Sequence, residues 1–486
     1  MSARILSADS MLAPFLVVCL IRLPLTLYLY FSFQQYSDPN NIILNSAVIW
    51  KDTFTYISPV ESYIASGNYT DCCRMPGFLP LYGSLYYLFG RDVSCLIWVL
   101  LQWLFTSYAI TILGKWAHMI TGRRVVAWAI FITGSVSSFF TLWDHAIMSD
   151  SFSTSLLILS AFSMHNYGKT KSLRYIFLSA FCLTAATFLR QINIVIIPIY
   201  FGFLLYYSRH DALKILIGKF AAFAIVPVVL FGSWTAHNYF THHKIIPLVR
   251  PINECWSSYF PERLKCAELM NVWGLDLVHW YPDTPAEWFN SQDIKSSVPL
   301  KLNQRLTNSY NADSIIAIKN TYSYFLLEND SSKKAMLGRS FMDRTDALID
   351  DYSKEKPFNR YFINRIGLGL QFLFPPRLDN LPLPPLSKMK WHQKVFKAFS
   401  YIMLLFVSLL ALVGSVFLIA TQHRSGLLLI LATPWAIFVF LSVFLGWIEQ
   451  RYFVPVYPFF LVIAVIFCDN ILRLTVKRFR FQPSSE

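Results

Sequence analysis

Isolated charged residues at the ends of apolar segments are the part of this sequence that could do chemistry. Asp52 and Arg74 lie in the polar stretch after the first apolar segment, Arg190 ends a later segment, and Arg451 begins the last one. Arginine matches phosphate oxygens with paired N–H donors, and a carboxylate can accept the proton of an attacking hydroxyl group. These residue types suit the transfer of a sugar from a polyprenyl phosphate, whose phosphate stays at the membrane surface.

Each of these four residues also has a purely structural explanation. Asp52 could cap a helix, and Arg190 could extend toward lipid headgroups. Arg451 could pair with the neighbouring Glu449 or anchor an interface. Both interpretations remain open at each position.

A second polar group flanks the short loop 142–147. Asp144 and His145 lie in this loop, and Asp150 lies at the start of the next apolar segment. Aspartates beside a short loop often cap helices, so a functional role is one of two interpretations. Arg22 is unusual because it lies in the middle of the first apolar segment, where it could pair with an acid or line a cavity.

The composition predicts an integral membrane protein. Hydrophobic residues make up 55% of the 486 residues and charged residues only 14%, whereas soluble domains are about one quarter charged. Apolar runs of roughly 17–25 residues are long enough to span a bilayer as helices. The sequence therefore predicts an all-α polytopic membrane protein with about ten transmembrane helices, at 11–33, 90–114, 125–141, 148–164, 174–190, 192–207, 215–234, 396–420, 426–447 and 452–472.

The net charge of +14 is explained by topology. Every second loop is basic, with clusters at 115–124, 169–174, 209–219, 423–424 and 473–480. Basic loops face the cytoplasm, so both termini are predicted inside and the loops carrying the isolated charges outside. The basic excess therefore does not indicate nucleic acid binding. No GxGxxG, Walker A, HExxH or GxSxG motif supports nucleotide, zinc-peptidase or serine-hydrolase chemistry.

Three parts are predicted along the chain. Residues 1–234 form a membrane body whose first external loop is 34–89, residues 235–395 form a mixed external domain, and 396–486 form the C-terminal membrane helices and a basic tail. Residues 359–371 mix arginine with apolar residues, as an interfacial helix does. An oxidising outer face would allow a Cys255–Cys266 disulfide or a bridge from Cys72 or Cys73.

Five short motifs carry a family resemblance. They are Asp52-Thr-Phe-Thr-Tyr56 with Arg74-Met-Pro-Gly77, Ser149-Asp150-Ser151, Phe188-Leu-Arg190, Trp234-Thr-Ala-His-Asn-Tyr239 and Arg451-Tyr-Phe-Val-Pro-Val-Tyr-Pro458. In this order they resemble the GT-C superfamily of integral-membrane glycosyltransferases, in the branch of protein O-mannosyltransferases and the lipid A aminoarabinose transferase. One departure is His237, which stands where an arginine is usual in the family.

The resemblance implies an inverting single displacement. Asp52 would be the catalytic base, and Arg74, Arg190 and Arg451 would hold the donor phosphate. Asp150 would act with Asp52 in catalysis, and Tyr56, Asp144 and His145 would orient the acceptor. The carboxylate and histidine side chains would also allow a divalent cation (Mg, Mn or Zn), and the sequence does not choose among these metals or establish that one is needed.

The resemblance does not determine the acceptor or the compartment. A glycan or lipid-linked acceptor of the bacterial envelope, such as the O-antigen of lipopolysaccharide or lipid A, is preferred, with the site facing the periplasm across the inner membrane. The alternatives are transfer to protein, with a luminal site in the endoplasmic reticulum, and a lipid or sugar transporter or flippase. Arg22 is the one feature that favours a transporter, and a non-catalytic membrane scaffold is a third class.

Overall fold

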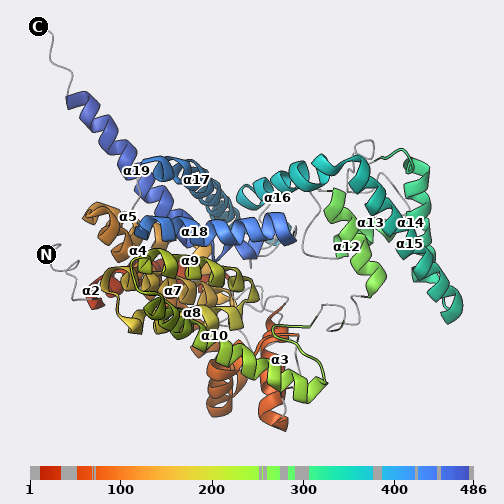
Figure 1. Ribbon diagram of the computed structural model, residues 1–486, viewed down its shortest axis with the longest axis horizontal. Helices are drawn as coiled ribbons and strands as arrows, with labels where there is room; N and C mark the ends of the chain where they lie inside the picture. The colour runs from red at the N-terminus through yellow and green to blue at the C-terminus, as the bar shows by residue number, and fades with distance from the viewer. Residues whose placement is uncertain are drawn as a thin grey trace, which may run out of the picture. The chain divides into compact units, whose positions relative to one another are not determined.

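The computed structural model describes residues 11–33, 52–67, 69, 73–250, 254, 260–273, 283–290, 306–375, 386–421, 425–445 and 450–480. These residues form helices and connecting turns, with no strand among them (Figure 1). The predicted all-α membrane architecture is therefore confirmed. Glu449, Cys72, Cys255 and the basic pair at 423–424 lie outside the described residues.

The chain forms two compact units. Unit 1 comprises Met1–Val249, Arg377–Ile437 and Gln450–Glu486, and unit 2 comprises Arg250–Pro376 and Phe438–Glu449. Unit 1 contains most of the membrane helices, and unit 2 contains the end of the apolar stretch Ser425–Leu445 together with most of the polar helices of the insertion.

Seven helical stretches in the described chain are long and apolar enough to cross a membrane. An eighth is formed if the bent pair α5 (Arg124–Val136) and α6 (Ser138–His145), which meet at 46°, is counted as one span. Each of the ten predicted segments falls on helical structure. The seven are α2 (Leu12–Phe33), η3 to α4 (Pro76–Thr121), η5 with α9 (Gln191–Ser208), α10 (Leu213–His242), α17 (Trp391–Thr421), α18 with η9 (Ser425–Leu445) and α19 (Tyr457–Arg480).

The two remaining predicted segments are α7 (Asp150–Thr170) and α8 (Leu173–Leu189), which pack closely against each other. Ser160 and Ser179 donate to each other's backbone carbonyls at 2.7 and 3.0 Å. Small side chains let the two backbones approach, and their hydroxyl groups find partners without water. This explains why a serine-rich sequence, which is less apolar than its neighbours, is helical and buried in unit 1.

The segment with Asp52 forms the short helix α3 (Thr53–Ser66). It ends at Gly67, whose φ of 75° lies in the left-handed region that glycine adopts without strain. The chain then returns through Cys73 and the turns η3 (Pro76–Phe78) and η4 (Leu79–Gly83) into α4 (Ser84–Thr121). Cys73 is disulfide-bonded, so a bridge from the Cys72/Cys73 pair is confirmed.

Unit 2 is built from α12 (Pro261–Trp273), α13 (Asp283–Asn290), α14 (Ala312–Leu327), α15 (Ser331–Glu355), η7 (Asn359–Ile363) and α16 (Asn364–Leu373). Its aromatic core includes Trp273, Phe289, Tyr322 and Phe341. Cys266 is buried in this core as a free thiol, so the predicted Cys255–Cys266 disulfide is wrong.

Candidate active site

Asp52 lies at the N-terminus of α3 and forms ion pairs with two arginines. Arg451 donates to Asp52 Oδ2, and Arg74 Nη2 lies 3.5 Å from the same oxygen. The carboxylate caps no backbone N–H of α3, although its residue occupies the N-cap position. The helix-cap explanation of Asp52 therefore does not hold, and the carboxylate is instead directed at cations that come from distant parts of the sequence.

Arg74 is held in place by α3 as well as by Asp52. Its Nε donates to Thr55 Oγ1 at 3.1 Å, and its guanidinium lies 4.5 Å from the centre of the Tyr56 ring. Tyr56 stacks on Phe78 at 5.0 Å, and Phe78 stacks on Trp98 of α4 at 4.3 Å. This column of rings fixes the arginine against the membrane helices. Tyr56 thus supports Arg74 through a cation–π contact.

Gly77 brings the Arg74 loop against the end of α8. A Cβ at this position would lie 2.5 Å from the carbonyl oxygen of Phe188, so only glycine allows this approach. Phe188 precedes Arg190 by two residues. The glycine of the Arg-x-Pro-Gly motif therefore places two arginine-bearing segments side by side.

Substitution of Gly77 by alanine is expected to reduce function strongly, because the Arg74 loop must move away from α8. Overpacking of this kind costs about 1–3 kcal/mol of stability, and a displacement of catalytic groups by about 1 Å can lower a rate roughly 100-fold. The measurement is the transfer rate together with the melting temperature of the purified variant. Gly232→Ala is the control, because a Cβ there meets no atom within 4 Å. Equal effects of the two substitutions would contradict the positioning role.

Asp150 and Arg190 form a second ion pair, between Arg190 Nη2 and Asp150 Oδ1. Asp150 is the first residue of α7 and Arg190 follows the last residue of α8, so each charge also complements the dipole of its helix. Asn193 fixes the turn, because its Nδ2 lies within hydrogen-bond distance of Ser153 Oγ at 2.7 Å and of the Arg190 carbonyl at 3.1 Å. Asp150 and Arg190 are both buried.

Tyr452 joins the two ion pairs into one cluster. Its ring lies 5.4 Å from the guanidinium carbon of Arg190 and 5.8 Å from that of Arg451. Burial alone would raise the pKa of Asp52, but the guanidinium groups of Arg451, Arg74 and Arg190 outweigh it and hold this pKa below its ordinary value of 3.8. Five of the eight predicted site residues, Asp52, Arg74, Asp150, Arg190 and Arg451, therefore lie in one arginine cluster, with Tyr56 beside it.

Asp144 is not part of the arginine cluster. Its Oδ2 pairs with Arg22 of α2, and its Oδ1 accepts a hydrogen bond from Thr106 at 2.7 Å. Arg22 also donates to Ser107 Oγ at 2.6 Å and to the Trp103 carbonyl at 2.9 Å. This buried pair ties α2, α4 and α6 together and explains the charge in the middle of α2. Asp144 therefore serves as the counter-ion of Arg22.

His145 is buried beside Asp144, and its Nε2 has no hydrogen-bond partner within the described residues. No three His, Cys, Asp or Glu side chains in the described part of the chain lie close enough together to hold a metal ion. Asp144 is engaged by Arg22 and Asp150 by Arg190, so the trio of Asp144, His145 and Asp150 does not fit a cation site.

The Trp234 motif holds the segment that follows it and one segment from early in the chain. Trp234 Nε1 donates to the Leu248 carbonyl at 2.6 Å, and Asn238 Nδ2 donates to the Ile246 carbonyl at 2.8 Å. His237 stacks on Trp234 and lies 2.9 Å from the Tyr69 carbonyl oxygen through its Nε2. His237 therefore anchors Tyr69, which follows α3 in the external loop that also contains Asp52.

Several supporting residues were not predicted as site residues, although Thr55 and Tyr452 lie within the motifs named above. Thr55, Asn193 and Tyr452 have ordinary types and spacing, and only the fold brings them to the charges. Glu61 of α3 is a further buried acid, which accepts hydrogen bonds from Tyr82 at 3.0 Å and from Arg91 Nε at 2.8 Å. Its partners are different from those of Asp52.

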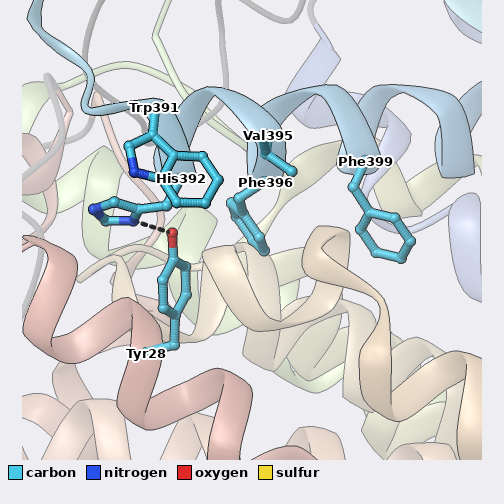
Figure 2. A pocket seen from close by; sticks show the side chains of 6 residues that line it. All are labelled: Tyr28, Trp391, His392, Val395, Phe396 and Phe399. Carbon is cyan, nitrogen blue, oxygen red and sulfur yellow. Dashed lines mark hydrogen bonds between the residues drawn. The ribbon is translucent and has the colours of Figure 1, made fainter.

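A groove of about 380 Å³ lies between α2 and α17, apart from the arginine cluster. Figure 2 shows Tyr28 of α2 facing the first turns of α17, where its hydroxyl and His392 Nδ1 share a hydrogen bond of 2.9 Å. The lining is aromatic and aliphatic and contains no Lys, Arg, Asp or Glu. It consists of Tyr28, Trp391, His392, Val395, Phe396 and Phe399.

Comparison with known proteins gives similar structures but no matching family. No protein-family model matches the chain, and no curated protein is significantly similar to it. The chain is similar to the crystal structure of ArnT from Cupriavidus metallidurans in the apo state, at 11% identity and a TM-score of 0.33, over 91% of this chain and 77% of that one. The structure of the same protein bound to undecaprenyl phosphate gives 11% identity and a TM-score of 0.34, over 96% and 79%. At these TM-scores the similarity carries no argument about fold or function.

Proposed function

We propose that this protein is a glycosyltransferase that moves a sugar from a polyprenyl-phosphate donor to an acceptor at the outer face of the membrane. The observation that carries the proposal is the cluster of three arginines and two carboxylates, drawn from four separate parts of the sequence. Three guanidinium groups and two carboxylates leave one surplus positive charge, which matches the single negative charge of a phosphodiester. Arg190 and Arg451 are buried and Arg74 is partly exposed, and arginines bind phosphate oxygens strongly through paired N–H donors.

The reaction is proposed as an inverting single displacement. The acceptor hydroxyl oxygen forms a bond to the anomeric carbon of the sugar while the bond from that carbon to the phosphate oxygen breaks. Asp52 takes the hydroxyl proton, and the polyprenyl phosphate leaves with the bonding electrons. Arg74, Arg190 and Arg451 stabilise the charge that develops on the leaving phosphate. Asp150 holds Arg190 in position.

Donor binding would release the base in this mechanism. Asp52 is paired with Arg451 and Arg74, the same groups that would hold the phosphate. A donor phosphate therefore competes with Asp52 for these guanidinium groups. Once it binds, the carboxylate loses its partners and gains a negative neighbour, which makes it a stronger base. The acid–base group is thus activated only when the donor is present.

The pH dependence should show this release. In the free protein Asp52 is held ionised to below its ordinary pKa of 3.8, so the acid limb of kcat/KM is expected below about pH 4. The acid limb of kcat reports the donor complex, and it is expected at a higher pH because a phosphate then faces the carboxylate. Transfer rates from saturating and limiting donor across the acid range would measure both limbs. Coincident limbs would contradict release of Asp52 by the donor.

The proposal also specifies the acceptor and the orientation of the site in the membrane. We favour an envelope glycan as acceptor, either the O-antigen of lipopolysaccharide or lipid A, with the site facing the periplasm of a bacterial inner membrane. The basic loops predicted to be cytoplasmic support the outward orientation of the arginine cluster. Arg22 no longer favours a transporter, because its charge is neutralised by Asp144.

The direct test is an assay of the purified protein in nanodiscs. Radiolabelled polyprenyl-phosphate sugars are supplied together with an envelope extract, and the labelled product identifies the acceptor. Transfer to a glycan or lipid supports the proposal, and transfer to protein would replace the proposed acceptor. Absence of transfer from every donor, with sugar flux into vesicles instead, would overturn the enzymatic proposal.

A further inference from the structure

One helix of unit 2 exposes an apolar face. From the residue before η7 to α16, Phe358, Phe362, Ile366 and Leu370 follow one another at intervals of four residues, and are 63%, 58%, 58% and 50% exposed. Side chains four residues apart lie on one face of a helix. A row of exposed aromatic and aliphatic side chains is costly in water, so this apolar stripe requires a covering surface.

The opposite face of α16 packs inside unit 2. A Cβ on Gly369 would lie 2.9 Å from the Phe438 ring, and the rings of Phe372 and Phe438 are 5.9 Å apart. Phe438 belongs to Ser425–Leu445, one of the stretches that are apolar and long enough to span a membrane. Within unit 2, α16 therefore packs against the last turns of this stretch, and the apolar stripe belongs to a helix that directly contacts a segment apolar enough to enter a membrane.

A second anchor fixes α16 to α12. Asn364 Nδ2 donates to the Val272 carbonyl at 2.8 Å, and Arg365 Nη1 donates to Asn271 Oδ1 at 3.0 Å. Asn271 Nδ2 also donates to the Leu445 carbonyl at 3.3 Å, at the end of the same span. The polar side of α16 is thus occupied by protein, and the apolar stripe is the side left exposed.

The charge of this segment is complementary to anionic lipid. Residues 356–378 contain four basic residues, Lys356, Arg360, Arg365 and Arg377, and no acidic residue. By contrast, α15 contains acidic residues at 343, 346, 350, 351 and 355. An amphipathic helix with large apolar side chains and basic residues is the pattern of a segment lying in the membrane interface.

We propose that η7 and α16 form a membrane-docking helix that lies in the plane of the bilayer. The apolar stripe inserts among the acyl chains, and Arg360 contacts the phosphate groups of anionic lipids. The proposed occupant of the exposed face is the lipid bilayer itself, because α16 contacts the end of a stretch that is apolar and long enough to span one. This inference is independent of the proposed sugar transfer.

Photo-crosslinking of the full-length protein in nanodiscs tests the docking helix. Benzoylphenylalanine replaces Phe362 in one protein and Met336 in another, in bilayers of equal parts phosphatidylcholine and phosphatidylglycerol. Met336 is a matched control because it is 60% exposed and belongs to the same unit. It lies 19 residues before the end of α15, and this distance is about 30 Å along the helix.

Mass spectrometry of the crosslinked peptides then distinguishes the outcomes. We expect lipid adducts at position 362 to exceed those at position 336 at least severalfold. The phosphatidylglycerol share of the adducts should exceed its share of the bilayer and fall after Arg360→Gln. Equal lipid labelling at the two positions, or a crosslink from position 362 to a second copy of the chain, would overturn the proposal.

Discussion

The Asp52→Asn protein is expected to lose sugar transfer and, at the same time, to bind polyprenyl phosphate more tightly than the wild type. Loss of a general base lowers a rate by about 10²–10⁴-fold. Asparagine cannot neutralise Arg451 and Arg74, so both arginines become available to the phosphate. Removal of this competition is expected to lower the Kd for polyprenyl phosphate by about tenfold, or about 1.4 kcal/mol.

A matched variant separates this effect from a general loss of charge. Glu61→Gln removes another carboxylate of α3 that is paired with an arginine, Arg91, outside the arginine cluster. Its affinity for polyprenyl phosphate is expected to stay at the wild-type value. Binding is measured by the concentration-dependent rise in melting temperature with polyprenyl phosphate alone, a readout that also confirms folding. Weaker binding by Asp52→Asn, with transfer by the wild type intact, would refute the competition while leaving the enzymatic proposal standing.

The second large effect is expected at the buried pair of Arg22 and Asp144. Arg22→Met leaves Asp144 in the interior without its counter-ion, so the carboxyl group must stay there unpaired or take up a proton. Breaking a buried ion pair in this way costs about 3–5 kcal/mol. Both side chains are fully buried, at 0% and 1% exposure, so water cannot compensate. The double variant Arg22→Met with Asp144→Asn is expected to recover most of this loss, because the asparagine still accepts a hydrogen bond from Thr106.

Reversible unfolding of the single and double variants in mixed micelles would measure this coupling. The wild type and Asp144→Asn alone complete the cycle, so that the interaction free energy can be separated from the cost of each substitution. If the double variant is as unstable as Arg22→Met, the ion pair with Asp144 is not what stabilises Arg22 within α2. Retention of transfer in the double variant is also expected, because neither residue belongs to the arginine cluster.

The sequence predicted that the chain is helical and which residues form the arginine cluster. It did not predict which charged residue pairs with which. Composition and run length are local properties, and they led to helices at all ten predicted segments. The pairing of Asp52 with Arg451 joins residues 399 positions apart, and no local pattern contains that information. The unusual position of Arg22 is evident in the sequence, but its partner is not, because the family resemblance implies acceptor orientation for Asp144.

Residues with a supporting role were the least predictable. Tyr452 and Asn193 act only through the geometry that brings them to Arg190. Gly77 was part of a motif, but its function depends on the approach of the Phe188 carbonyl. The disulfide was ambiguous for a similar reason, since spacing alone cannot choose among cysteines in the external loops.

The disulfide at Cys73 has a consequence for the order in which the protein matures. Cys73 is adjacent to Arg74 and is disulfide-bonded, and such bonds persist only in oxidising compartments. If this loop faces the outside, as proposed, the helices can insert while the thiols are still reduced, and the bond at Cys73 forms only after that residue has crossed the membrane. In the proposed orientation, completion of the arginine cluster is therefore tied to export, and a chain retained on the reducing side would keep its helices without this covalent constraint beside Arg74.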